Sequence, residues 1–410
     1  MRLLWIATKA PWPPRDGGRL LLAESLAALA AQGVRITLVA PVTRSAYAAT
    51  HAALAAVCEP RLVATRPRSR AFAVLSAAVS GTPYSLTRHA RPELAREVAR
   101  ALHPRDDAPF DLVVAEQLQA FAHSAPAQRA GVPRLLRAQN VECDLWRQLG
   151  EASRGFTRAL LLRQAERLAR AERAALASAD ATIALSAVDG ERLRALAPES
   201  ARIEVLAPPF PGELASAEQH LAGAPALVLF GSAGWEPNRR AELRFVDEIW
   251  PRVRATNPSA ALHWFGGVGA VGGFGERRSA RPGVFLHRSP ATSGEAFSPG
   301  AILVLPLDIA SGVRMRVLEA WARGVVLVAS PAAASGLMAS DGRELLLARS
   351  AEEFAVAIDR LATIPGLAER LIAGGRARLA ADHAPARFAV RFVAFAGRVA
   401  ARAASATPGQ

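Results

Sequence analysis

The sequence has 410 residues, of which 51% are hydrophobic and 21% are charged, so it is long enough for two domains and lacks the composition of a disordered chain. The two cysteines, Cys58 and Cys143, have no cysteine or histidine neighbour at metal-ligand spacing, which argues against a disulfide framework and a zinc site. The net charge of +14 leaves two interpretations open: an anionic ligand or membrane surface, and a generic basic surface, which we favour because only Lys9 among the 50 basic residues is lysine.

The chain begins with the strand-like segment Arg2–Ala7 rather than with a targeting segment. It lacks the long apolar run and the small-residue cleavage site of a signal peptide, and no apolar run approaches the roughly 20 residues that span a bilayer. We therefore expect a cytoplasmic protein without a nucleic-acid partner, and a peripheral contact with the inner membrane stays open.

Short runs rich in valine, isoleucine and leucine alternate with helix-length segments through the first half. Arg19–Gln32 has the leucines and alanines of a helix, and Gly33 stands where a helix ends in left-handed conformation. Alternating strands and helices predict a parallel sheet with helices on both faces. The strands are expected at Leu3–Ala7, Val34–Val39, Leu112–Ala115, Pro133–Arg137, Ala181–Leu185 and Ile203–Leu206.

The proline cluster Ala207–Gly212 predicts a linker, because it cannot continue a helix or a central strand. The chain therefore divides into a first domain at 1–207, a linker at 208–224, a second domain at 225–384 and an amphipathic helix with a frayed tail at 385–410. This pattern predicts an α/β protein with two Rossmann-like doubly wound domains facing across a cleft, and ligands at the carboxyl ends of the strands. The second set of strands is expected at Leu227–Phe230, Ala261–Phe265, Val284–His287, Ile302–Leu305, Val325–Ala329 and Glu344–Leu347.

The loop after the first strand is the first candidate binding segment. In Thr8–Gly18, a proline-rich turn and the pair Gly17 and Gly18 precede a helix, whose unpaired N–H groups stabilise an anion. The alternative, that the glycines only permit a tight turn, stays open.

Two further segments follow strands of the second domain. Gly231, Trp235 and Asn238 suit the edge of a ligand site, although Trp235 also suits a core. After the next strand, Gly266 is followed by Gly267, Gly269 and Gly272, which match the dinucleotide spacing G-x-G-x-x-G. No helix pattern follows them, and the opening strand lacks this fingerprint, so we reject a dehydrogenase. His287 ends a strand at the same edge and suits either a nucleotide contact or a structural role.

The most specific segment is Pro306–Ala329. The amides of Ser311, Gly312 and Val313 lie in a loop that opens a helix and can cradle a phosphate, which Arg314 or Arg316 can neutralise. Glu319 falls near the middle of that helix and would be costly to bury without a partner, for which we favour a ribose diol. The structural alternative stays open, that Glu319 only pairs with Arg314 or Arg316 on the helix.

Gly312–Ala329 resembles the loop and helix G-x-x-x-K-x-L-E-A-x-A-x-G-x-P-V-V-A of glycosyltransferase family 4. Thr8–Gly18, Trp235–Asn238 and Arg137–Glu142 are also similar to that family, particularly to its bacterial sugar transferases, so the resemblance covers nearly the whole chain. It implies a GT-B fold and hexosyl transfer from a UDP-, GDP- or dTDP-sugar to an unidentified acceptor. The implied reaction retains anomeric configuration and needs no cofactor and no metal.

The resemblance also implies residue roles. Arg316 replaces the family's lysine and, with Arg314 and Glu319, forms the catalytic set, in which Glu319 binds the ribose. The residues that bind the donor are Gly17, Gly18, Gly231, Trp235, Asn238, Gly266, Gly267, His287, Ser311, Gly312 and Val313. The C-terminal helix is expected to return to the first domain. Acceptor binding is assigned to Lys9, Arg137, Asn140 and Glu142.

Three positions depart from the family pattern. Ser311 stands where many members carry the first of two glutamates, Glu116 and Gln117 replace a histidine-rich turn, and Val325 replaces a proline. The departures leave two alternatives open: a nucleotide-sugar epimerase of the same fold, and a non-catalytic protein that binds a nucleotide sugar or a polyanion. Arg66–Arg70, followed by Phe72–Val79, also has the character of a basic amphipathic patch, which suits a lipid-linked acceptor.

Overall fold

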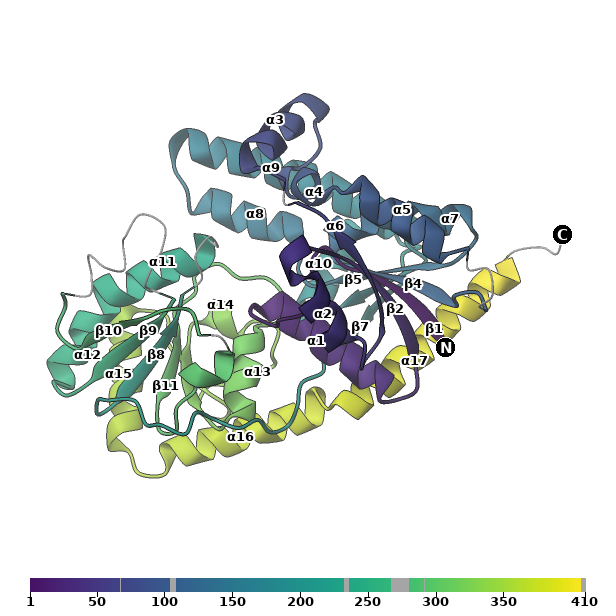
Figure 1. Ribbon diagram of the computed structural model, residues 1–410. Helices are drawn as coiled ribbons and strands as arrows, with labels where there is room; N and C mark the ends of the chain where they lie inside the picture. The colour runs from purple at the N-terminus through teal and green to yellow at the C-terminus, as the bar shows by residue number, and fades with distance from the viewer. Residues whose placement is uncertain (67, 104–107, 232–235, 267–279, 291, 407–410) are drawn as a thin grey trace. The chain divides into compact units, whose positions relative to one another are not determined.

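The computed structural model describes residues 1–66, 68–103, 108–231, 236–266, 280–290 and 292–406 (Figure 1). Residue contacts divide the chain into two units. The first unit comprises Met1–Pro209, Ser311–Val313 and the chain from Pro385 onward, and the second comprises Phe210–Ala310 and Arg314–Ala384. The first crossing between the units therefore falls at Pro209–Phe210, in the proline cluster.

The first unit contains a parallel sheet in the order β3-β2-β1-β4-β5-β6-β7. The apolar runs correctly indicated every strand except β3, which lies at the sheet edge, contains Pro60 and buries only Leu62. An edge strand needs neither a continuous apolar run nor a full set of N–H donors. The strands are β1 Arg2–Ile6, β2 Arg35–Val42, β3 Glu59–Ala64, β4 Leu112–Glu116, β5 Arg134–Ala138, β6 Ala181–Ala184 and β7 Ile203–Val205.

Helices surround this sheet. The predicted helix after β1 is α1, which begins where the Asp16 side chain accepts a hydrogen bond from the Arg19 N–H, and Gly33 follows it with a φ of 75° as expected. The helices of this unit are α1 Gly17–Ala30, α2 Tyr47–Leu54, α3 Arg70–Ser80, α4 Tyr84–His89, α5 Pro92–Ala101, α6 Leu118–Phe121, α7 Ala125–Arg129, α8 Glu142–Glu151, α9 Gly155–Ser178, α10 Ala187–Leu196 and α17 Pro385–Ala406.

The C-terminal helix α17 packs on α1 and β1 of the first unit. Phe388, Phe392, Phe395 and Val399 recur at helical spacing and are buried, so they form one apolar stripe. The Phe392 ring stacks on Trp5 of β1, with 5.7 Å between ring centroids. This stripe explains why a helix at the end of the sequence belongs to the unit that begins it.

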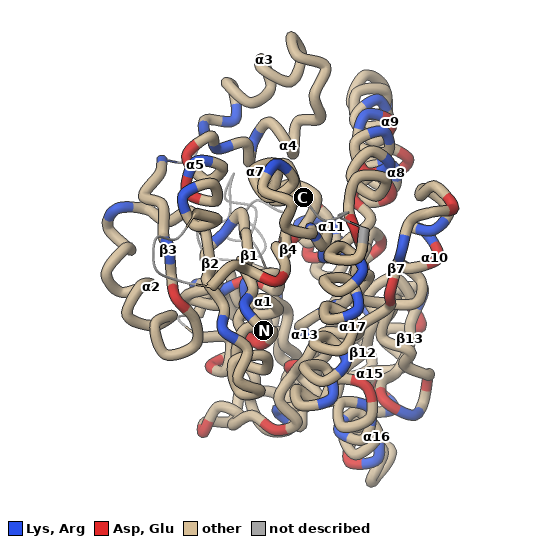
Figure 2. Tube along the Cα trace, turned by 90° about the vertical axis from the view of Figure 1, so that its right-hand side faces the viewer, with Lys and Arg blue, Asp and Glu red and all other residues tan. Residues whose placement is uncertain are grey.

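The second unit repeats the same architecture in the order β10-β9-β8-β11-β12-β13, again with parallel pairing. All six predicted strands are present, at β8 Ala226–Phe230, β9 Ala261–Phe265, β10 Val284–His287, β11 Ile302–Leu305, β12 Val326–Ala329 and β13 Leu346–Leu347. Charged residues of both signs lie along its outer helices, such as α16 (Figure 2). The α-helices are α11 Glu236–Arg244, α12 Trp250–Thr256, α13 Met315–Ala322, α14 Pro331–Ala334, α15 Ala351–Thr363 and α16 Leu367–Asp382.

Each sheet has one point where the strand order reverses. β1 lies between β2 and β4, and β8 lies between β9 and β11. Loops leaving such neighbours diverge to opposite faces, so a crevice opens at the carboxyl ends of the two strands, where doubly wound proteins bind ligands. Lys9 and Gln117 follow the reversal strands β1 and β4, and Gly231 and Arg316 follow β8 and β11, whereas other candidate residues follow the neighbouring strands β5 and β9 or end β10. Within the described part of the chain, no helix combines the length and apolar composition that a bilayer crossing requires.

The α17 stripe gives a direct test of this fold. Phe392→Ala should lower the free energy of unfolding by about 3–5 kcal/mol, because it removes a buried ring and leaves a cavity beside Trp5. The control Val390→Ala, at a position of the same helix that is 60% exposed, should change it by less than about 0.5 kcal/mol. Urea denaturation measures both values, and equal effects would contradict the observed packing.

Candidate functional site

A buried carboxylate stands at the centre of the second unit's candidate site. Glu319 on α13 is 1% exposed. Its Oε2 accepts a hydrogen bond from Arg316 Nη1 at 2.6 Å, and its Oε1 accepts from Arg323 Nε at 3.2 Å and from the Ser293 hydroxyl. The two guanidinium groups offset the desolvation of the carboxylate, which would be strongly unfavourable alone.

Arg316 lies at the carboxyl end of β8. Its guanidinium carbon is 4.3 Å from the centroid of the Phe230 ring, and Phe230 is the last residue of that strand. The side chain of Arg316 remains 26% exposed, so its positive charge can still meet a ligand. Arg314 lies half-buried immediately before α13. The structure thus brings Arg316 and Glu319 together beside the strand-order reversal of the second sheet.

Gly231 and Gly266 follow β8 and β9, and both have a packing explanation. A Cβ on Gly231 would lie 2.8 Å from an Oε of Glu242, and a Cβ on Gly266 would lie 2.8 Å from the Gly231 carbonyl oxygen. Gly266 also has a φ of 86°. Asn238 lies half-buried on α11. Trp235 and Gly267, expected donor contacts, lie outside the described residues, as do Gly269 and Gly272.

His287 is held within its own sheet. Its Nε2 lies 3.0 Å from Nδ1 of His263, and its ring stacks on Phe265 with 4.4 Å between centroids. Burial, and then the neighbouring His263, lower the pKa of His287. His287 therefore has the structural role that the sequence left open. Its contact with a nucleotide stays a prediction.

The first unit has its own buried carboxylate at the carboxyl end of β4. Glu116 accepts hydrogen bonds from Trp5 Nε1 at 2.9 Å, Arg137 Nη1 at 2.7 Å and Gln139 Nε2 at 2.7 Å. Arg137 is fully buried and also donates to the Ser25 hydroxyl at 2.9 Å. The Arg137 side chain, assigned to acceptor binding, therefore ties β5 to β4 and α1.

A small hollow adjoins this network, lined by residues after β1, β4 and β5. Lys9, Gly18, Gln117 and Gln139 contribute to its walls, and Lys9 Nζ lies 3.8 Å from a carboxylate oxygen of Asp16. Gly17 is the first residue of α1 beside it. Gln117 has a φ of 73°, a strained conformation for a residue with a Cβ, and such strain concentrates at functional sites.

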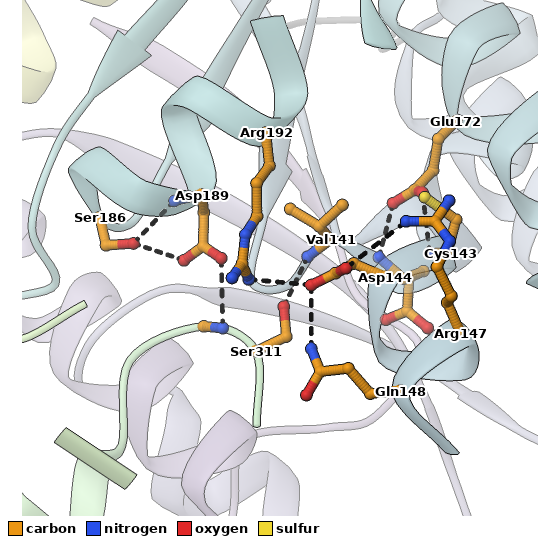
Figure 3. Close-up of polar contacts among 12 residues, drawn as sticks. Val141, Cys143, Asp144, Arg147, Gln148, Glu172, Ser186, Asp189, Arg192 and Ser311 are labelled. Carbon is orange, nitrogen blue, oxygen red and sulfur yellow. Dashed lines mark hydrogen bonds and ion pairs between the residues drawn. The ribbon is translucent and has the colours of Figure 1, made fainter. Parts of the chain in front are cut away.

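Asn140 and Glu142 lead into α8, whose first turn is capped by a distant carboxylate. Glu172 on α9 accepts hydrogen bonds from the N–H groups of Glu142 at 2.7 Å and Cys143 at 2.9 Å (Figure 3). Burial raises the pKa of Glu172 to about 7 and also raises the pKa of Glu142. Asn140 is half-buried, and its side-chain amide, turned so that nitrogen faces the neighbouring acceptors, donates to the Gln139 carbonyl oxygen at 3.1 Å.

The predicted phosphate cradle packs on the ends of β5 and β6 in the first unit. The Ser311 hydroxyl accepts from the Val141 N–H at 3.0 Å, and the Gly312 N–H donates to Asp189 at 3.4 Å (Figure 3). A Cβ on Gly312 would lie 2.1 Å from the Gln139 carbonyl oxygen, so only glycine fits. Val313 is buried next to them. The Gly312 N–H, which the sequence predicts to bind a phosphate, thus donates to the Asp189 carboxylate in this conformation.

Several residues of both sites were missed by sequence reasoning. Arg323, Glu242 and Glu172 each complete a buried polar network. Glu172 gave a detectable signal, because it interrupts the buried stripe of Leu168, Ala175 and Leu176 on α9. Arg323 also gave a signal, because it stands four residues after Glu319, the spacing of an ion pair on one helix face. Glu242 gave none, since its partner Trp264 is set by tertiary packing.

Family models match most of the chain. A model described as a glycosyl transferase 4-like domain matches residues 17–209, and one described as glycosyl transferase-like matches residues 290–394. None of the curated proteins matches the sequence.

Solved structures match both units together. The sucrose-phosphate synthase from Thermosynechococcus elongatus has a TM-score of 0.69 at 14% identity, over 99% of this chain and 100% of that one. HepE from Anabaena, solved with UDP and glucose, has a TM-score of 0.68 at 13% identity, over 97% and 100%. TarM has a TM-score of 0.65 at 10% identity, over 96% and 98%. At these identities the likeness shows the fold, which is GT-B.

The raised pKa of Glu172 predicts a pH dependence of stability. Between about pH 4.5 and the folded pKa of about 7, the native state keeps a proton that the unfolded state releases. The free energy of unfolding should therefore fall as the pH rises through this window, by about 1.4 kcal/mol per pH unit from this group. Glu172→Gln should flatten the curve, as urea denaturation at several pH values can measure. Parallel curves for the two proteins would contradict the assignment.

Proposed function

The chain is a GT-B glycosyltransferase that resembles family 4, and we propose that it transfers a hexosyl group from a UDP-, GDP- or dTDP-sugar to an acceptor, with retention of configuration and without a metal or other cofactor. The acceptor belongs to one of three classes: a polysaccharide, a lipid-linked sugar or a secondary metabolite.

The observation that carries this proposal is the network around Glu319. An ionised carboxylate has about four lone-pair sites, and Arg316, Arg323 and the Ser293 hydroxyl occupy three of them. A ribose hydroxyl can take the fourth site or replace the neutral Ser293 hydroxyl without changing the charge balance. Arg323 then keeps the buried carboxylate compensated while Arg316 turns its guanidinium toward the donor diphosphate.

This arrangement suits the charges that develop during sugar transfer. As the bond between sugar and diphosphate breaks, negative charge grows on the diphosphate and positive charge grows on the sugar ring. A fixed guanidinium at the diphosphate stabilises that state more than the ground state, which is the requirement for catalysis. Arg314 and the amides of Ser311–Val313 are assigned to the same diphosphate. If the leaving phosphate accepts the acceptor's proton, no side chain needs to act as a base.

The proposal places acceptor binding on the first unit. Lys9 offers an exposed ammonium group beside the hollow, and Gln117 and Gln139 offer amides. Arg137 and Glu142 are buried, so their contribution is to position the loops after β4 and β5 rather than to touch the acceptor. These roles are supported by the placement of the residues at the carboxyl ends of the strands.

Glu319→Gln tests the donor site most sharply. The substitution keeps the shape but weakens charge-assisted hydrogen bonds, each worth about 1.5–3 kcal/mol, so affinity for the matching nucleoside diphosphate should fall roughly 10–100-fold. Isothermal titration calorimetry with UDP, GDP and dTDP measures this change.

Glu344→Gln is the matched control, because Glu344 is a buried carboxylate of the same unit that pairs with Arg378 at 3.1 Å. It should lower the melting temperature yet leave nucleotide affinity unchanged. If Glu319→Gln behaves in the same way as this control, Glu319 only stabilises α13, and the donor assignment is wrong.

A further inference from the structure

The large apolar side chains of helix α3 are exposed to solvent, and its small side chains pack against the rest of the first unit. Phe72, Leu75 and Val79 are 55%, 65% and 82% exposed, whereas Ala73 and Ala77 are buried against the unit. The exposed positions follow helical spacing, so they form one continuous apolar face. A contiguous apolar face on the surface of a soluble protein marks an interaction site.

The beginning of α9 extends this apolar face. Phe156 is 84% exposed and Leu160 is 47% exposed. The two helices are neighbours, because Arg167 Nη1 on α9 donates a hydrogen bond to the Ala77 carbonyl oxygen on α3 at 3.1 Å. Figure 1 shows both helices at the same end of the first unit, away from the carboxyl-terminal part of α17. We call residues 66, 68–81 and 154–170 the α3–α9 surface.

The same surface concentrates positive charge. Segments 66–81 and 154–170 contain eight arginines and one glutamate, a net charge of +7, which is half of the chain's +14. Arg163, Arg167 and Arg170 line a hollow between α9 and Gly81 together with the single acid, Glu166. Basic residues lie along α9 in Figure 2. Before α3, Arg66 is exposed and Arg68 lies over the Phe72 ring, and Arg70, the first residue of α3, is exposed as well.

We propose that the α3–α9 surface binds the face of an anionic lipid bilayer. Phe72, Leu75 and Val79 enter the boundary between headgroups and acyl chains, while the arginines on both sides of them meet lipid phosphates. An apolar helix face flanked by basic residues has the two attractions that hold an interfacial helix: buried apolar area and charge complementarity. A nucleic acid would satisfy the arginines but leave the apolar face in water, so the bilayer fits the whole surface better.

Vesicle binding by the full-length protein tests this proposal. Sedimentation with phosphatidylcholine vesicles that contain about one third phosphatidylglycerol should show binding that weakens as salt rises, because added salt screens the arginines. Vesicles of phosphatidylcholine alone should bind the protein at least about tenfold more weakly. Equal binding to both vesicle types, or no binding to either, would overturn the proposal.

Two double variants separate the two attractions. Arg163→Glu with Arg170→Glu should weaken binding to anionic vesicles at least about 25-fold, since each arginine near an anionic surface contributes about fivefold. Leu75→Glu with Val79→Glu should abolish binding at high salt. The matched controls are Arg360→Glu with Arg370→Glu, and Val356→Glu, which change exposed positions of the second unit. These controls should bind vesicles like the wild type, with melting curves confirming that every variant is folded.

Light scattering without lipid distinguishes a protein interface. If the wild type is a dimer that Leu75→Glu with Val79→Glu converts to a monomer, and vesicle binding is unchanged, then the surface binds a second copy of the chain and the bilayer proposal is wrong. Nucleotide affinity should stay unchanged in all of these variants, so failure of this proposal is distinguishable from failure of the donor assignment.

Discussion

Glu319 is almost completely excluded from water, and its charge is sustained only by the groups that converge on it. Arg323, one turn further along the chain, also lies over the Phe297 ring and donates to the Ala215 carbonyl oxygen. Phe297 in turn packs against Phe230 at the end of β8, with 5.3 Å between ring centroids. The ion pairs of one carboxylate therefore fix α13, the loop before β11 and the end of β8 relative to one another.

The first unit also contains a buried carboxylate whose charge must be compensated, that of Glu116. Its carboxylate also lies at a strand end beside the reversal of strand order, and Arg137 neutralises it in the protein interior. The two carboxylates differ in what surrounds them. Arg137 is fully buried, whereas Arg316 keeps part of its surface exposed. An arginine that still meets water can exchange a protein contact for a ligand contact, which is why the proposed chemistry is assigned to the second unit and a positioning role to the first.

The periodic features of the fold were predictable from the sequence because they depend on local composition. Apolar runs located twelve strands, and the one failure, β3, contains a proline and buries a single leucine. The segment around Glu319 was predictable because a carboxylate in the middle of an apolar helix requires a partner. Two of its partners, Arg316 and Arg323, stand three and four residues away, a spacing that the sequence shows. The third partner, Ser293, was not predictable, because only the folded chain brings it near.

The contacts of the predicted phosphate cradle, Ser311–Val313, were even less predictable from the sequence. Ser311 meets Val141, and Gly312 meets Asp189, across sequence separations of 170 and 123 residues. No local pattern encodes such pairs. The strained φ of Gln117 was equally invisible, because a positive φ at a residue with a Cβ is imposed by surrounding packing rather than by propensity.

The proposed reaction breaks the bond between sugar and diphosphate in a nucleotide sugar. The most direct measurement is a proton NMR time course of the purified protein with UDP-, GDP- and dTDP-hexoses, which reports both the released nucleoside diphosphate and the anomeric proton of the sugar. We expect one donor to lose its sugar, slowly to water and faster once a suitable acceptor is added, and Arg316→Ala to lower this rate more than it lowers donor affinity. Isomerisation of the sugar while it stays attached to the nucleotide, or binding of the donor without any reaction, would contradict this expectation.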